Sequence, residues 1–306
     1  MNQFVRRYGK ILLPLITPYR EDERVDYDQY GRLIEYLLEK DLCDSFIVTG
    51  TTGEASLLTV QERVNLIKTA LDTVKGRKPV IAGTGCASTQ ETLSLTQEAV
   101  RLGVETCMVV CPFYNKPTQQ GIYMHFERLA RQTGANIMLY NIPVFVGVNM
   151  EPETVARLAA IPNIVGIKDE AGINPTQITD YALATREVDS DFALYNGDDI
   201  MLLPTLIQGA MGLVSGGAHI FGQEIRAIFQ AFEVGETARA RALFEPIYRF
   251  CKSLGQNGRI LPNSIMRPAV ERVTGIRLGP PRLPLAPATD QELMATFQIL
   301  EQAGKL

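Results

Sequence analysis

Histidine is scarce in this chain of 306 residues. Only His125 and His219 are present, they are far apart, and neither lies in a metal-binding motif. Imidazole is the commonest protein ligand for transition metals, so a histidine-rich metal centre is excluded by count. A magnesium site built from carboxylates alone stays open. Its ligands would be four acidic residues, Asp169, Glu170, Asp198 and Asp199.

Cysteine is also sparse and shows no pairing pattern. The chain has five cysteines, an odd number, and no C-x-x-C pair. Neither a disulfide framework nor a zinc ribbon is therefore indicated, and we expect most of the cysteines to be small core residues. This usage fits the reducing conditions of the cytoplasm, which is the location that we predict.

Long apolar runs and clusters of basic residues are absent as well. No run approaches the ~20 residues that span a membrane, and the amino terminus has no apolar segment before a small-residue cleavage site. The net charge is −4, and the lysines and arginines are scattered along the chain. We therefore expect neither a membrane nor a nucleic acid as a partner.

Short apolar runs alternate with longer amphipathic ones through most of the chain. About eight such units occur, without a change in composition, and this pattern predicts a (β/α)8 TIM barrel over residues 1–233. A helical pattern introduced by Asp26 follows the first run, and Thr59 with Glu62 forms a capping box before another helix. The expected strands are 11–16, 45–48, 79–82, 106–111, 136–140, 164–168, 192–195 and 212–215.

The strand pattern ends after Glu233. Residues 237–254, 261–274 and 290–303 have helical periodicity, and the proline-rich segment 279–287 separates the last two of these stretches. We therefore predict a C-terminal helical region over residues 234–306.

Lys168 ends the sixth expected strand, whose β-branched residues indicate burial on both faces. The carboxyl ends of barrel strands carry the chemistry in TIM barrels. Apolar surroundings disfavour an ammonium ion, so we expect a lowered pKa for Lys168 and a neutral amine that can attack a ketone. The alternative is a lysine that leaves the strand and extends to water.

Hydroxyl groups follow three other expected strands. Thr51 and Thr52 lie in a glycine-containing loop after the second strand, Tyr114 follows the fourth, and Tyr140 ends the fifth. Each of them alone is ordinary turn or packing chemistry. In a barrel they converge with Lys168 on one mouth, where hydroxyl groups can relay protons.

The chain resembles the dihydrodipicolinate synthase and N-acetylneuraminate lyase family of Schiff-base pyruvate aldolases. The resemblance covers nearly the whole chain. Its motifs are Gly50-Thr51-Thr52-Gly53-Glu54, Tyr114-Asn115-Lys116-Pro117, Tyr140-Asn141-Ile142-Pro143, Gly166-Ile167-Lys168, Asn196-Gly197-Asp198-Asp199 and Arg282-Leu283-Pro284-Leu285.

The resemblance implies a role for each matching residue. Lys168 would form an imine with pyruvate or another 2-oxo acid, and Tyr140 would transfer protons. Thr51 would complete the relay with Tyr140 and with Tyr114, which in this family reaches into the neighbouring subunit's site. Further substrate contacts would come from Thr52, Gly50, Val214, Gly197 and Phe145.

The same resemblance implies that no cofactor and no metal are needed. It also implies a homotetramer built as a dimer of dimers. The partners would be a small 2-oxo acid and an aldehyde.

Phe145 departs from the synthase pattern. Dihydrodipicolinate synthases carry an arginine in the matching segment, where it engages the carboxylate of aspartate semialdehyde, and phenylalanine cannot form that bidentate contact. We therefore expect aldol cleavage, condensation or dehydration of a 2-keto-3-deoxy sugar acid. A basic residue from elsewhere, such as Arg6, Arg7 or a residue of a neighbouring subunit, would restore the synthase activity.

Three alternatives remain at this point. The first is the dihydrodipicolinate synthase itself, condensing pyruvate with aspartate semialdehyde. The second is a non-catalytic barrel that binds a keto acid, since fold does not fix function. The third is a lyase that depends on the magnesium site described above.

Overall fold

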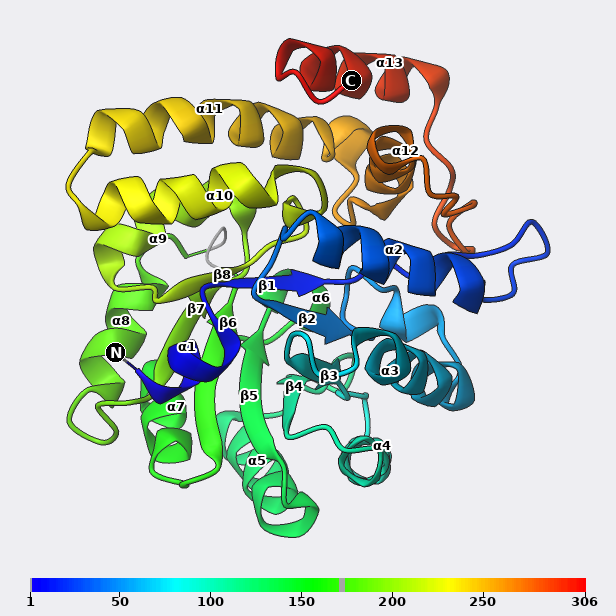
Figure 1. Cartoon of the computed structure of the whole chain (residues 1–306). Helices are drawn as coiled ribbons and strands as arrows, with labels where there is room; N and C mark the ends of the chain where they lie inside the picture. Colours follow the sequence, from blue (N-terminus) through cyan, green and yellow to red (C-terminus); the bar gives the residue numbers. More distant parts are fainter. Residues whose placement is uncertain (1, 171–173) are drawn as a thin grey trace.

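A closed barrel of eight parallel strands forms the centre of the molecule (Figure 1). The structure is a computed structural model that describes residues 2–170 and 174–306. The strands follow one another in chain order, and β8 pairs with β1, which confirms the predicted (β/α)8 barrel. The strands are β1 (Ile11–Pro14), β2 (Ser45–Val48), β3 (Val80–Gly83), β4 (Thr106–Val110), β5 (Asn136–Asn141), β6 (Ile164–Asp169), β7 (Ala193–Asn196) and β8 (Gly212–Val214).

Helices connect the strands and surround the barrel (Figure 1). Two of them begin at the predicted caps: the Asp26 side chain accepts a hydrogen bond from the backbone amide of Gln29, and Thr59 and Glu62 form a capping box. These helices are α2 (Tyr27–Glu39), η1 (Ala55–Leu57), α3 (Val60–Val74), α4 (Thr89–Arg101), α5 (Gln119–Thr133), α6 (Pro143–Val146), α7 (Pro152–Ala159), α8 (Gln177–Thr185), η2 (Asp199–Met201), α9 (Leu202–Gln208) and α10 (Ala218–Glu233).

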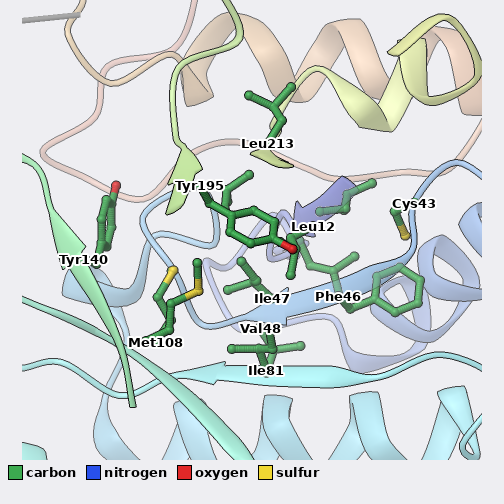
Figure 2. Close-up of a cluster of buried hydrophobic side chains, with 14 of the residues drawn as sticks. Leu12, Cys43, Phe46, Ile47, Val48, Ile81, Met108, Tyr140, Tyr195 and Leu213 are labelled. Carbon is green, nitrogen blue, oxygen red and sulfur yellow. The ribbon is translucent and has the colours of Figure 1, made fainter. Parts of the chain in front are cut away.

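The strands are buried, as their apolar sequences predict. Figure 2 shows part of this core, in which Leu12, Phe46 and Ile47 come from neighbouring strands and are fully buried. Burial of each such side chain contributes about 1.5–3 kcal/mol relative to an exposed one. A filled barrel interior of this kind is a rigid support for the side chains at the strand ends.

The amino end of the barrel is covered by α1 (Gln3–Tyr8). The Tyr8 hydroxyl and Thr106 Oγ1, at the start of β4, share a hydrogen bond of 2.7 Å, and Phe4 packs edge-on against Tyr195. Arg7 forms an exposed ion pair with Glu105, directly before β4. The amino end is therefore closed, and Arg7 lies on the face opposite to the carboxyl ends of the strands.

Three α-helices and one short 3-10 helix follow the barrel: α11 (Thr237–Ser253), η3 (Gln256–Gly258), α12 (Asn263–Thr274) and α13 (Asp290–Gln302). In Figure 1, α11 lies along α10, and α13 packs on α11 and α12. Their apolar residues belong to the same core as those of the barrel, so the division at residue 233 stays a prediction. Among the described residues, no helix is long and apolar enough to cross a membrane.

A buried ion pair joins α12 to the threonine loop that follows β2. Arg267 Nη1 lies 3.2 Å from Glu54 Oε1, and both side chains are fully buried. The side-chain amide of Asn263 donates hydrogen bonds to Glu54 Oε1 (3.0 Å) and to the backbone carbonyl of Thr52 (2.9 Å). The C-terminal region therefore holds the loop that carries Thr51 and Thr52.

We expect Arg267→Ala to lower the free energy of unfolding by about 3–5 kcal/mol, because it leaves the Glu54 carboxylate buried without its partner. Urea denaturation followed by circular dichroism at a fixed protein concentration measures this loss. Arg249→Ala is the matched control, since Arg249 and Glu245 form an exposed pair and should contribute less than about 1 kcal/mol. Equal losses in the two variants would contradict this account.

Candidate active site

Lys168 and Tyr140 face each other at the carboxyl ends of β6 and β5. Parallel pairing aligns the two residues across the strands. The Lys168 side chain is only 7% exposed, and its Nζ lies 3.8 Å from the centroid of the Tyr140 ring. The ammonium group thus rests on the aromatic face, an arrangement that stabilises positive charge.

A hydroxyl chain extends from this pair. The Tyr140 hydroxyl and Thr51 Oγ1 share a hydrogen bond of 3.3 Å. Burial raises the pKa of Tyr140 above its ordinary value, although the neighbouring Lys168 charge opposes the shift. Tyr140 is therefore protonated at neutral pH, and Thr51 gives it a partner with which a proton can be exchanged.

The Glu170 side chain belongs to the site, although the sequence does not predict its contact with Lys168. It directly follows β6, and its Oε2 lies 3.5 Å from Lys168 Nζ. Burial raises the pKa of Glu170 to about 8; Lys168 opposes this shift and Asp198 adds to it. The sequence indicates this side chain only as a candidate magnesium ligand. The available signal was its position, one residue beyond a buried strand and two beyond the lysine.

The expectation of a lowered pKa for Lys168 is wrong. Burial of the ammonium group acts to lower the pKa of Lys168, but the oxygens of Tyr140 and Glu170 outweigh it and raise the pKa above the ordinary value. The sequence shows the apolar strand and not the carboxylate that folds back beside the amine. Lys168 is therefore an ammonium ion until a neighbouring group takes its proton.

One cavity of about 360 Å³ brings most of the predicted residues together. Gly50 lines an adjoining hollow instead, and Tyr114 lies outside the cavity, with 89% of its surface exposed. Asp198, Cys251 and Lys252 also line the cavity, and no sequence pattern predicts the last two there. The predicted residues in its wall are Thr51, Thr52, Tyr140, Phe145, Lys168, Gly197 and Val214.

Gly197 leaves the space that the lysine occupies. A Cβ atom at this position would lie 2.2 Å from Lys168 Cε and 2.6 Å from Glu170 Oε2, far inside van der Waals contact. Any larger residue would displace both side chains. Glycine is therefore required here by the close approach of Lys168 and Glu170.

Two of the acidic residues of the magnesium hypothesis are held by other groups. Asp169 accepts hydrogen bonds from the amides of Asn141 (2.8 Å) and Gln177 (2.7 Å). Asp199 accepts hydrogen bonds from the Ser215 hydroxyl and from a backbone amide. Burial raises the pKa of each of these two carboxyls to about 6. The described part of the chain contains no group of three or more His, Cys, Asp or Glu side chains arranged to hold a metal ion.

The rim of the cavity combines apolar and basic side chains. Val144 and Phe145 are 45% and 39% exposed. Arg259 is fully engaged, because its guanidinium group pairs with Glu292 at 2.7 Å and donates to two backbone carbonyls. Lys252 is exposed, and within residues 2–170 and 174–306 it forms no ion pair. Arg7, on the closed face of the barrel, does not replace the missing arginine.

The barrel fold and the buried lysine at the end of β6 define a lyase of the class I aldolase type. Residues 7–303 match the profile of the Dihydrodipicolinate synthetase family, and the chain belongs to this family. Since its members are lyases, the non-catalytic barrel is not retained.

Two curated relatives are each 38% identical to this chain, and both are named 4-hydroxy-tetrahydrodipicolinate synthase. The protein from Desulforudis audaxviator aligns over 98% of this chain and 99% of its own length. The protein from Bacillus subtilis aligns over 96% of this chain and 99% of its own length.

Two solved structures show the same similarity. A dihydrodipicolinate synthase from Bacillus anthracis matches with a TM-score of 0.90 and 36% identity, over 96% of this chain and 98% of that chain. A dihydrodipicolinate synthase from Cyanidioschyzon merolae with lysine bound also matches with a TM-score of 0.90 and 36% identity, over 98% and 99% of the two chains.

Proposed function

We propose that this protein forms a Schiff base between Lys168 and pyruvate or another 2-oxo acid, and that Tyr140 carries the proton transfers. The observation that supports the proposal best is the stacking of Lys168 Nζ on the Tyr140 ring, whose hydroxyl group meets Thr51. The Lys168 amine, the Tyr140 phenol and the Thr51 hydroxyl can thus all contact one small ligand.

The chemistry follows from this arrangement. Once the Lys168 ammonium group has lost a proton, the neutral amine adds to the ketone carbon, and loss of water gives an iminium ion. Its positive charge favours removal of a proton from the adjacent carbon, which yields an enamine. Tyr140 accepts this proton as its own passes to the Thr51 hydroxyl and on to solvent, and the reverse transfer returns a proton to the carbon. The Thr51 and Thr52 loop receives the carboxylate of the 2-oxo acid.

We predict that Lys168→Ala abolishes the covalent adduct that borohydride traps from pyruvate, because no other amine occupies the imine position. Mass spectrometry of the digested protein locates the label. Lys68→Ala, an exposed lysine on α3, is the control and should trap with unchanged yield. Undiminished trapping in Lys168→Ala, with an unaltered circular dichroism spectrum in both variants, would contradict the assignment of Lys168 as the Schiff-base residue.

For the second part of the reaction we propose a 2-keto-3-deoxy sugar acid, which the enzyme cleaves, forms or dehydrates. The rim residues Val144 and Phe145 are apolar, and the acidic residues Glu170 and Asp198 line the interior. A carboxylate entering here without a partner costs several kcal/mol, whereas a charge-assisted pair contributes about 1.5–3 kcal/mol. Uncharged hydroxyl groups avoid this cost.

A second candidate is the condensation of pyruvate with aspartate semialdehyde by a 4-hydroxy-tetrahydrodipicolinate synthase. The names of the relatives at 38% identity support it. The exposed ammonium group of Lys252 at the cavity also supports it, since it offers the semialdehyde carboxylate a partner.

One pair of variants separates the two candidates. We expect the wild-type protein to prefer a 2-keto-3-deoxy sugar acid, and Phe145→Arg to shift the ratio of kcat/KM values toward aspartate semialdehyde by about tenfold to a hundredfold, at about 1.4 kcal/mol per decade. Lys252→Met should leave the ratio within about threefold. Met294→Arg, an exposed change on α13, controls for added charge.

The opposite pattern favours the synthase. A wild-type preference for the semialdehyde that falls more than tenfold in Lys252→Met would overturn the sugar-acid assignment. Coupled assays with purified substrates, run at one pH and ionic strength, report both ratios.

We also propose a homotetramer made of two dimers, working in the cytoplasm. The exposed Tyr114 supports the assembly, because 89% of its surface is free of its own chain and is available to pack against a neighbouring subunit. The five cysteines, all free thiols, support the location.

A further inference from the structure

Lys168 is flanked by a proton-carrying group on each side. Tyr140 approaches it from β5, and Gly197 follows β7, the neighbouring strand on the other side. The Glu170 carboxyl occupies the side of Gly197, where its Oε2 is 3.5 Å from Lys168 Nζ. A ligand joined to Lys168 would therefore meet a phenol on one side and a carboxyl on the other.

The Glu170 carboxyl is open to the cavity. Its side chain is 22% exposed and lines the cavity wall, and the described residues offer its oxygens no donor other than Lys168. Asp199, in the same region, accepts a hydrogen bond on each of its two oxygens. Buried carboxyls with a purely structural role are normally satisfied in this way. Glu170 retains the capacity to bond to a ligand.

The raised pKa of Glu170 allows its carboxyl group to act as a proton donor. Burial raises the pKa of Glu170 to about 8, so the protonated form is populated at neutral pH. The titratable groups that face it are Lys168 and Asp169 from β6, Tyr140 from β5 and Asp198 from the loop after β7. Conversion of Lys168 to an iminium ion keeps a positive charge beside Glu170 during the reaction.

We propose that Glu170 is the acid that protonates the departing oxygen when this enzyme dehydrates a 2-oxo acid carrying a hydroxyl group on the second carbon from the ketone. The inference rests on the proposed Schiff-base function and specifies its reaction. Four bonds of about 1.5 Å or less separate that oxygen from the imine nitrogen, so the oxygen falls about 3–5 Å from Nζ, within hydrogen-bond reach of Glu170.

The step balances without an external reagent. In the enamine, the nitrogen lone pair re-forms the iminium double bond, and the carbon–carbon π pair moves to the next bond along the chain. The carbon–oxygen bond breaks, its electron pair leaves with oxygen, and the Glu170 proton completes a water molecule. Solvent returns to Glu170 a proton equivalent to the one that Tyr140 removed. Hydrolysis of the imine then frees the unsaturated 2-oxo acid.

The test compares two reactions of Glu170→Gln. Deuterium exchange into the pyruvate methyl group, followed by proton NMR, needs only imine and enamine formation. Loss of water from a panel of 2-keto-3-deoxy sugar acids needs the added acid. We expect the ratio of the dehydration rate to the exchange rate to fall at least a hundredfold from its wild-type value, the usual size of an acid contribution. Glu105→Gln, at the closed end of the barrel, is the control and should change neither reaction.

Each other outcome overturns the inference. Equal losses of exchange and dehydration would show that Glu170 acts only through Lys168. Unchanged dehydration would show that the reaction does not need the Glu170 carboxyl. The wild-type protein could instead exchange deuterium into pyruvate but only cleave the sugar acids, with release of pyruvate. This result would show that the enzyme does not dehydrate these substrates. A wild-type protein without exchange or adduct would refute the Schiff-base function itself, which is a distinguishable result.

Discussion

The parallel pairing of β5, β6 and β7 is the constraint on which the site depends. The register places Tyr140 beside Lys168, and Asp169 beside Asn196, at the same level of the barrel. Because the ring is closed, no strand can slip without moving all its neighbours. The amine, the phenol and the glycine that leaves room for them are therefore fixed by main-chain hydrogen bonds rather than by flexible loops.

Lys168 and Glu170, at the end of β6, influence each other's pKa values. Lys168 is buried, and burial alone would lower its pKa, yet the oxygens of Tyr140 and Glu170 raise it above the ordinary value. Burial in turn raises the pKa of Glu170. At neutral pH Lys168 therefore keeps its proton, and Glu170, with a pKa of about 8, is largely protonated beside it. A site of this kind can release its nucleophile and supply an acid in the same turnover.

Much of the fold follows from local patterns. The alternation of apolar runs and amphipathic helices predicts the barrel, and the capping residues Asp26 and Thr59 mark helix starts that the structure contains. Lys168 and Tyr140 could be placed at one mouth because the carboxyl ends of parallel strands meet there. These predictions need only the order of the chain and the geometry of strands.

The rest depends on contacts between distant residues. Nothing near Glu54 in the sequence indicates Arg267 as its partner, and nothing near Lys252 places that lysine at the cavity. The lowered pKa expected for Lys168 is wrong for the same reason, since the side-chain direction of Glu170 is set by tertiary packing. Sequence patterns give the strand on which a group lies, and the folded structure decides which groups it meets.

The most direct test of the account is a crystal structure of the protein after borohydride reduction with pyruvate. We expect continuous density from Lys168 Nζ to the ketone carbon of the ligand, with its carboxylate at the Thr51 and Thr52 loop, and with Tyr140 and Glu170 on opposite sides of the new bond. An unmodified Lys168, or an adduct on another lysine such as Lys252, would contradict the account.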